Sequence, residues 1–199
     1  TNHTYFMREA EHFKYLQMEV FPFLEKSVHH KDLRIWCAAS SSGEEPYTLA
    51  MLLEDYFGNQ VPSWEKKLLA TDISVDILKT ATNGFYSKEK VNSIPKIWVI
   101  NYFDKIDNTQ YQIKDKIRNQ GIFRRFNLLE RVFPFKKKFH VIFCRNVMIY
   151  FDAPTKDRLI EKFYNHLEYG GYLFIGHSES IDRSKTRFEY IRPAVYRKM

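Results

Sequence analysis

The chain is poor in the residues that define several classes of protein. Its 199 residues include 2 cysteines, 7 glycines and 7 prolines. Two cysteines are too few for a disulfide framework or a four-ligand zinc site, and both lie in apolar segments, where free thiols are normally buried. So little glycine and proline excludes collagen and low-complexity chains. These absences favour an ordinary globular protein in a reducing compartment.

Long apolar runs are missing as well. The longest, at residues 141–144 and 172–175, are far shorter than the ~20 residues that cross a bilayer, and the first residues show no signal-peptide pattern. We therefore expect a soluble, cytoplasmic protein. With 44% hydrophobic residues, a chain of this length can bury a core within one domain.

Acidic residues are outnumbered by basic ones. The 31 Lys and Arg against 24 Asp and Glu give a net charge of +7. Such an excess suits an anionic partner such as nucleic acid, anionic lipid or an acidic protein surface. Its densest clusters, at residues 124–125 and 136–138, are short. They are either solvated turns or a means of steering the protein toward a carboxylate-rich substrate.

The hydrophobic pattern predicts alternating strands and helices. Helices are expected at residues 8–26, 44–57, 75–82, 97–103 and 155–167, and strands at residues 33–38, 67–70, 139–144 and 172–176. This alternation indicates an α/β fold with a mostly parallel sheet. Two short strands at residues 111–117 and 121–127 interrupt it, and we expect them to form an inserted antiparallel hairpin, a small subdomain over about residues 108–127.

The ends of the predicted strands carry the candidate ligand-binding residues, because open α/β sheets bind ligands at the carboxyl ends of their strands. Asp72 ends the second strand and is placed to accept hydrogen bonds from both hydroxyls of a ribose. The alternative is that Asp72 caps the following helix. The first turn, at residues 40–45, lacks both glycine-rich phosphate motifs, which favours a nucleoside without phosphates. Carboxylates such as Glu45 would repel phosphate but could attract a sulfonium.

Five segments carry a family resemblance. They read Thr-Tyr-Phe-Met-Arg-Glu (4–9), Ser-Gly-Glu-Glu-Pro-Tyr (42–47), Ala-Thr-Asp-Ile (70–73), Cys-Arg-Asn-Val-Met-Ile-Tyr-Phe (144–151) and Gly-His-Ser-Glu-Ser (176–180). In this order they resemble the CheR-type chemotaxis receptor glutamate methyltransferases. The resemblance implies a class I S-adenosylmethionine-dependent methyltransferase fold with a seven-stranded sheet. It also implies methyl esterification of glutamates on the cytoplasmic domains of membrane chemoreceptors, with no nucleic acid partner and no membrane insertion, and we expect a monomer.

The resemblance also implies which residues form the site. The cofactor-binding positions are Asn2, Thr4, Arg8, Glu45, Asp72, Asn127, Leu128, Arg145 and Asn146. Arg8 and Tyr150 are the expected catalytic residues. Arg8 would pair with the carboxylate of either the cofactor or the glutamate, and Tyr150 would place its phenol on the incoming carboxylate, unless it is a packing residue with a solvated hydroxyl. An ionised glutamate is already a nucleophile at neutral pH, so no general base is expected.

Histidines and cysteines are not expected to take part. The seven histidines show no metal-ligand spacing, so we expect no metal. Cys37 and Cys144 are expected to be free, buried thiols that lie close together in neighbouring strands, where they could face each other.

Two other functions and one question of domain organisation remain. A nucleic acid methyltransferase would share the fold, but it should carry an Asn/Asp-Pro-Pro-Tyr/Phe loop, which residues 145–148 do not match. A noncatalytic signalling module should have lost Glu45, Asp72 or Arg145, and all three are present.

The resembling family usually has a small helical domain ahead of its Thr-x-Phe-Phe-Arg segment. Since the chain starts at Thr1 without Met, we expect it to be the catalytic domain of a longer protein.

Overall fold

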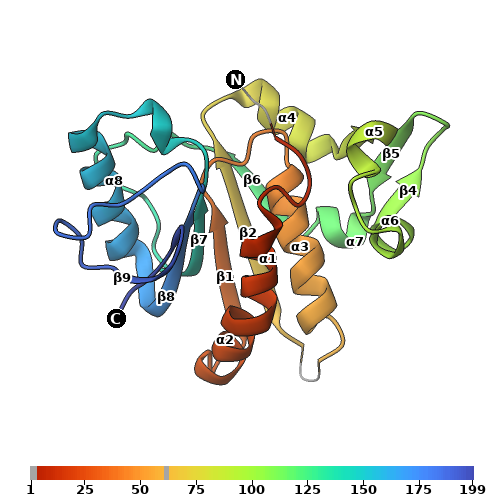
Figure 1. Ribbon diagram of the computed structural model, residues 1–199. Coiled ribbons are helices and arrows are strands. Elements are labelled where there is room, and N and C mark those ends of the chain that lie inside the picture. Colours follow the sequence, from red (N-terminus) through yellow and green to blue (C-terminus); the bar gives the residue numbers. More distant parts are fainter. Residues whose placement is uncertain (1–3, 61–62) are drawn as a thin grey trace.

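A seven-stranded sheet runs through the middle of the computed structural model, which describes residues 4–60 and 63–199 (Figure 1). The strands are β1 (Asp32–Cys37), β2 (Glu65–Asp72), β6 (Gly121–Arg125), β7 (Phe139–Cys144), β8 (Leu167–Ile175), β9 (Glu189–Arg192) and β10 (Val195–Arg197). Their order across the sheet is β6-β2-β1-β7-β8-β10-β9. The first five in that order are parallel, and β10 pairs antiparallel with both β8 and β9. The predicted mostly parallel, seven-stranded fold is confirmed.

Helices cover both faces of this sheet. On one face α1 (Ala10–Tyr15), the π-helical turn η1 (Leu16–Val20) and α2 (Phe21–Ser27) run on continuously, and α3 (Glu44–Phe57) packs beside them. On the other face α8 (Ala153–His166) packs against the sheet. α4 (Val75–Asn83) lies next to β2 and β6. The central strand β7 is buried along its whole length, as expected for a parallel strand covered by helices on both sides.

The two cysteines are free and buried, as predicted. They lie in neighbouring strands, with Cys37 in register with Phe143. However, the two thiols do not face each other. Because side chains alternate along a strand, Cys37 points into the core on the side of α1 to α3, whereas Cys144 points into the core on the side of α8.

A small antiparallel sheet forms a separate lobe beside α3 and α4 (Figure 1). It consists of β3 (Phe85–Ser87), β4 (Phe103–Lys105) and β5 (Gln110–Ile113), with α5 (Lys88–Val91), α6 (Lys96–Tyr102) and α7 (Asp115–Arg118) around it. β5 is the middle strand and pairs antiparallel with β3 and β4. A small antiparallel subdomain is therefore present as predicted, but its strands lie at residues 85–113, and of these only β5 falls within the predicted residues 108–127.

The expected pairing within this subdomain is wrong. Residues 121–125 do not fold back on residues 111–117 but form β6, an edge strand of the main sheet that runs parallel to β2. The strand predicted at residues 111–117 is also too long, because β5 ends at Ile113 and the helix α7 follows. An edge strand is covered less completely than a central one, so its alternating pattern resembles that of a hairpin strand. The short α7 makes the crossing from one sheet to the other.

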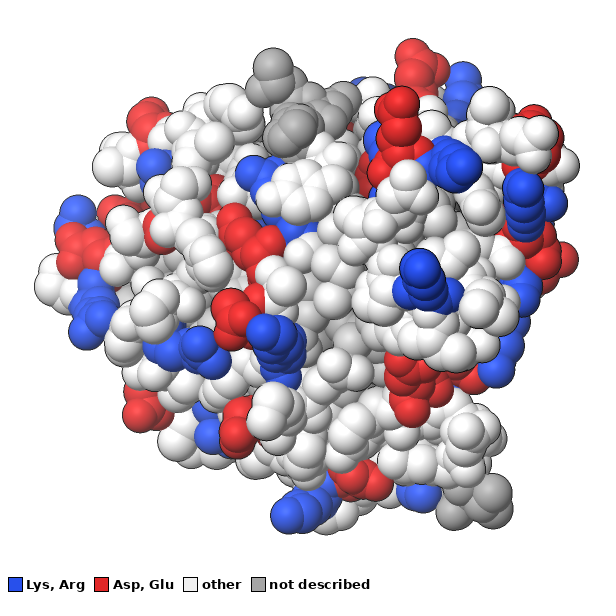
Figure 2. All heavy atoms as spheres, turned by 45° about the vertical axis from the view of Figure 1, so that its right-hand side comes forward, with Lys and Arg blue, Asp and Glu red and all other residues white. Residues whose placement is uncertain are grey.

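The outer surface carries charge of both signs. On the face shown in Figure 2, Lys and Arg side chains are interspersed with Asp and Glu among the coloured residues, and the basic excess does not gather there into one patch. Among the described residues, no helix combines the length and the apolar character needed to cross a membrane.

Candidate functional site

A hollow of about 250 Å³ opens where β1, β2 and β7 end. It brings together seven of the residues predicted for the site: Thr4, Arg8, Glu45, Asp72, Arg145, Asn146 and Tyr150. Tyr5, Phe13, Ala39, Ser41, Ile73 and Val147 complete its lining. The hollow therefore lies at the carboxyl ends of adjacent parallel strands, where the sequence predicted a ligand.

The loop between β1 and α3 forms one wall. Ser41 (φ 47°) and Gly43 (φ 99°) have left-handed backbone conformations. At Gly43 a Cβ atom would lie 2.7 Å from the hydroxyl oxygen of Tyr86, so both the conformation and the close contact require glycine. The Ser41 hydroxyl is buried and finds no hydrogen-bond partner within residues 4–60 and 63–199. This loop therefore presents an unsatisfied polar group at the hollow.

Asp72 holds the loop against the end of β2. Its Oδ2 accepts a hydrogen bond from the Ser41 backbone N–H at 2.9 Å, and its Oδ1 accepts one from the Ser74 N–H at 3.0 Å. The N-cap of α4 is Ser74, whose hydroxyl accepts from the Ile77 N–H at 3.4 Å. The alternative role of Asp72 as the helix cap is therefore wrong, because the cap lies two residues further along the chain.

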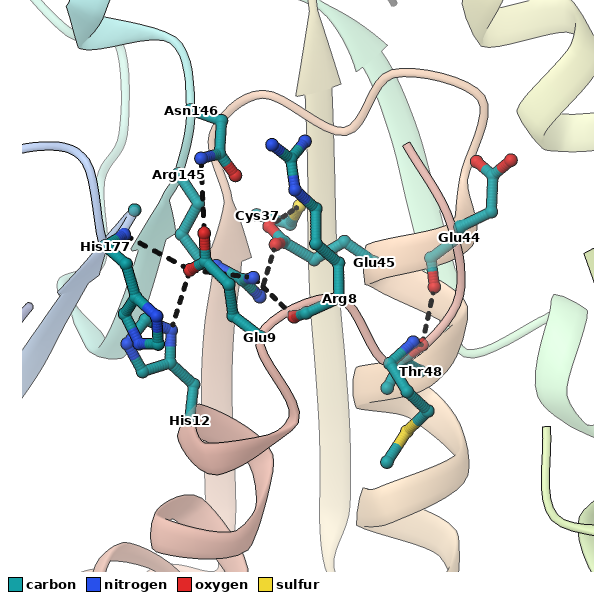
Figure 3. A network of polar contacts seen from close by, with 12 residues as sticks. Arg8, Glu9, His12, Cys37, Glu44, Glu45, Thr48, Arg145, Asn146 and His177 are labelled. Atoms are coloured by element: carbon teal, nitrogen blue, oxygen red, sulfur yellow. Dashed lines mark hydrogen bonds and ion pairs between the residues drawn. The ribbon is translucent and has the colours of Figure 1, made fainter. Parts of the chain in front are cut away.

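Arg145 connects the segments that form the walls of the hollow (Figure 3). Its side chain, only 1% exposed, lies 3.1 Å from the Glu9 carboxylate and 2.9 Å from the Glu45 carboxylate. It also donates a hydrogen bond to the backbone carbonyl of Arg8. One guanidinium thus ties the segment that carries Arg8 to the start of α3. Its planar array of donors suits this multiple pairing.

The two carboxylates respond to Arg145 differently. Burial raises the pKa of Glu45, and the charge of Arg145 opposes this shift. Burial also tends to raise the pKa of Glu9, but the Arg145 charge and a hydrogen bond from the Asn146 amide hold it below its usual value. Glu45 in addition accepts a hydrogen bond from the Cys37 thiol at 3.1 Å.

Glu9 and Glu179 are site residues that the sequence reasoning missed. Glu179 accepts hydrogen bonds from the backbone N–H groups of Asn146 (2.9 Å), Met148 (2.7 Å) and Gly176 (2.6 Å). It thereby fixes the turn after β7, in which Asn146 has φ 58°. Both glutamates lie inside segments that carry the family resemblance, which was the one available signal. Their partners are too distant in the sequence for spacing to reveal them.

Asn127 and Leu128, also predicted for the site, are not among the residues that line this hollow. Asn127 lines an adjoining hollow of about 530 Å³ that shares Ile73 with the first. The Phe126 N–H donates to the carbonyl of Asp72 at 2.9 Å, which places Asn127 near the end of β2. The Leu128 side chain packs in the core on the α8 side. Asn2 lies outside the described residues.

A histidine cluster lies behind Glu9. Possible metal-ligating atoms of Glu9, His12 and His177 lie within 4.8 Å of one another, a grouping that sequence spacing did not predict. His12 is 2% exposed, and burial, reinforced by the Arg145 charge, lowers its pKa to about 3. The Glu9 oxygen 3.5 Å from His12 Nδ1 is the one that Arg145 already neutralises. The fixed positive charge there disfavours a divalent cation.

Comparison with known proteins decides the family. A family model described as "CheR methyltransferase, SAM binding domain" matches residues 2–196. The chain belongs to this CheR family. Its relatives include the chemotaxis protein methyltransferase of Borreliella burgdorferi, 43% identical over 201 residues that cover 100% of this chain and 71% of the relative. The chemotaxis protein methyltransferase of Escherichia coli is 34% identical, over 98% of this chain and 67% of the relative.

Membership of the CheR family confirms the predicted fold class, enzyme class and cofactor. The protein is an S-adenosylmethionine-dependent methyltransferase. Among solved structures, the glycopeptide N-methyltransferase MtfA in complex with S-adenosylmethionine gives a TM-score of 0.45 at 14% identity, over 72% of this chain and 46% of that chain.

Proposed function

We propose that this CheR-family protein transfers a methyl group from S-adenosylmethionine to glutamate side chains on the cytoplasmic domains of chemoreceptors, acting in the cytoplasm as a monomer. The observation that carries the proposal is the hollow at the ends of β1, β2 and β7. There Arg8 and Tyr150, suited to a carboxylate, face the same space as Glu45 and Asp72, suited to a sulfonium nucleoside.

The residues of the hollow fit this cofactor. Ser41 lines the hollow, and its buried hydroxyl has no hydrogen-bond partner among the described residues. Asp72 keeps acceptor capacity beyond its two backbone hydrogen bonds, because an ionised carboxylate has about four lone-pair sites. We assign Asp72 to the ribose hydroxyls and Glu45, with Thr4, to the amino acid end. The base would reach the adjoining hollow at Asn127, since Ile73 lines both spaces.

The buried ion pairs serve to position these groups. Arg145 lies between Glu9 and Glu45 and holds the Arg8 backbone, so we assign it to orienting the walls of the hollow. Asn146, fixed by Glu179 and Glu9, completes the floor. Holding reacting groups in place in this way can supply much of the rate enhancement of an enzyme.

Arg8 and Tyr150 are assigned to the methyl acceptor. Tyr150, on the 3-10 turn η2 (Met148–Tyr150), is 62% exposed while it lines the hollow, so it reaches both cofactor and incoming protein. The Arg8 guanidinium lies 5.9 Å from the Tyr5 ring centre on the opposite wall. When bound, the cofactor supplies the methyl group on a sulfonium sulfur that leaves as a thioether. An acceptor glutamate with a pKa of ~4.3 is ionised at neutral pH, so the protein has only to align it and exclude water.

The experiment is methyl transfer to a defined acceptor. The protein is incubated with methyl-labelled S-adenosylmethionine and a chemoreceptor cytoplasmic fragment, with RNA and DNA in parallel reactions. We expect label on the fragment that alkali releases as methanol, since carboxyl methyl esters hydrolyse readily. The control is a fragment whose methylatable glutamates are changed to alanine. Label that resists alkali, or that enters nucleic acid instead, would contradict the proposal.

A further inference from the structure

The small antiparallel sheet contacts the wall of the hollow through Tyr86. This β3 residue is 3% exposed, and its hydroxyl donates a hydrogen bond to the Ser42 carbonyl at 2.7 Å. The same hydroxyl oxygen occupies the space that a Cβ on Gly43 would need. Tyr86 therefore fixes two successive residues of the loop from behind, and it lies outside the residues that line the hollow.

The ring of Tyr86 also supports the opposite wall. Its centroid lies 4.8 Å from that of Phe6 in an edge-to-face arrangement, and Phe6 in turn contacts Phe103 of β4 at 5.7 Å. Phe6 is 1% exposed and precedes Arg8 by two residues. One aromatic side chain of the small sheet thus packs against the Arg8 segment while its hydroxyl holds the loop after β1.

Lys90 provides a second link. From α5 it pairs with the Glu44 carboxylate, which is fully buried at the start of α3. The other oxygen of Glu44 accepts a hydrogen bond from the Ser42 hydroxyl at 2.6 Å. Lys90 is 43% exposed, but Glu44 is not exposed at all, so this carboxylate relies on Lys90 and the Ser42 hydroxyl for its polar contacts. Ser42 is therefore held at its carbonyl by Tyr86 and at its hydroxyl by the Lys90–Glu44 pair.

We propose that Tyr86 and Lys90 are positioning residues for the cofactor. The small lobe, through Tyr86 of β3 and Lys90 of α5, keeps the loop at residues 40–43 and the segment at residues 4–8 in their binding geometry. The lobe and the hollow thus form one energetically coupled unit. This inference rests on the proposed function, because that function makes the loop a cofactor wall.

The chain offers a matched control for Tyr86. The Tyr47 hydroxyl also donates to a backbone carbonyl at 2.7 Å, and Tyr47 is 1% exposed, but its partner is Ala81 on α4 and not the loop. Tyr86→Phe and Tyr47→Phe therefore remove the same atom from the same kind of buried hydrogen bond. Binding of S-adenosylhomocysteine is measured for both by calorimetry, together with the thermal midpoint. We expect similar losses of stability, but about fivefold to tenfold weaker binding for Tyr86→Phe alone.

Lys90 gives an independent test. Lys90→Met should weaken S-adenosylhomocysteine binding several-fold, and Lys90→Arg, which keeps the charge, should restore most of it. Lys79→Met, which breaks the exposed pair of Lys79 with Asp76, is the control and should leave binding unchanged. If the wild type binds but Tyr86→Phe binds as well as Tyr47→Phe, the inference is wrong and the proposed function stands. A wild type that binds no S-adenosylhomocysteine would contradict both.

Discussion

The two ends of the central strands both place an arginine between two carboxylates, but they bury it differently. At the carboxyl ends, Arg145 is 1% exposed between Glu9 and Glu45. At the amino ends, Arg34 is 17% exposed, 2.6 Å from Asp32 and 2.9 Å from Glu168, which is itself 40% exposed. Asp32 is 15% exposed, much like Glu45, but it has a second cation, Lys137, at 3.0 Å, and solvent screens Glu168. Among the described residues, Glu45 forms an ion pair with Arg145 alone, which is itself buried, so this group depends more strongly on its arginine. The difference indicates that the buried group serves to hold the site in place.

Left-handed backbone conformations of the described non-glycine residues are more frequent at the carboxyl ends of the strands than at the amino ends, where Lys31 (51°) precedes β1. Several of the described non-glycine residues with positive φ lie around the hollow, including Glu9 (56°), Ser41 (47°) and Asn146 (58°). Left-handed conformations are costly for most residues and persist where the surroundings enforce them. The hydrogen bonds from Ser41 to Asp72 and from Asn146 to Glu179 provide that enforcement.

The largest effect should come from removing the central arginine at each end. Arg145→Met leaves Glu9 and Glu45 without their charged partner, and we expect it to lower the free energy of unfolding by about 3–5 kcal/mol. Arg34→Met, the matched change at the amino ends, should cost less, about 1–2 kcal/mol, because Lys137 still pairs with Asp32 and Glu168 is 40% exposed. Urea unfolding of both variants measures the difference. Equal losses would show that burial does not distinguish the two ends.

Each end also holds a buried histidine, which allows a comparison by pH. Burial is the main cause that lowers the pKa of His12 to about 3 and that of His140 to about 4. Below pH 6.5 these histidines bind protons in the unfolded chain but not in the folded protein. The free energy of unfolding therefore decreases as the pH is lowered from 6.5 to the folded pKa.

Replacing either histidine with Asn should remove its part of this fall. We expect the slope of unfolding free energy against pH to decrease by up to about 1.4 kcal/mol per pH unit between pH 6.5 and the folded pKa. The decrease in slope should extend to lower pH for His12→Asn than for His140→Asn, because the folded pKa of His12 is the lower of the two. Denaturant unfolding at several pH values measures the slopes, and unchanged slopes would mean that both histidines bind protons as readily in the folded protein as in the unfolded chain.

The smallest effect on cofactor affinity should come from Tyr150→Phe. Its hydroxyl is assigned to the acceptor carboxylate, so affinity for S-adenosylhomocysteine should stay within about twofold while turnover on a receptor fragment falls about tenfold. Tyr169→Phe, at an exposed tyrosine near the amino ends of the strands, is the control for both measurements. If Tyr150→Phe turns over as fast as the wild type, the Tyr150 hydroxyl does not bind the acceptor, and Tyr150 is a packing residue with a solvated hydroxyl.

Local sequence signals predicted those parts of the fold that depend on neighbouring residues. The bounds of α3 and β7 agree with the prediction, because Gly-Glu-Glu-Pro marks a helix start and six buried residues mark a covered strand. Asp72 was placed in the hollow because a strand end fixes its position. β6 was misassigned because its parallel partner, β2, lies about fifty residues earlier in the chain.

The charge network could not be predicted for the same reason. Arg145 and Glu9 are 136 positions apart, since 145 − 9 = 136, and nothing in either neighbourhood specifies the pairing. The cap of α4 was ambiguous between Asp72 and Ser74, because both residue types cap helices and only the backbone geometry separates them. Sequence thus indicated which residue types gather at the strand ends, and tertiary packing determined which of them touch.

The most direct test of the account is the affinity of Asp72→Ala for S-adenosylhomocysteine. Asp76→Ala, a change four residues away at a side chain that is 92% exposed, is the control. If the carboxyl ends of the strands bind the cofactor, calorimetry should show binding ten- to a hundredfold weaker for Asp72→Ala, with the fold retained, since a charged hydrogen bond contributes ~1.5–3 kcal/mol. Asp76→Ala should bind as the wild type does. Equal affinity of the two variants would contradict the assignment of this hollow to the cofactor.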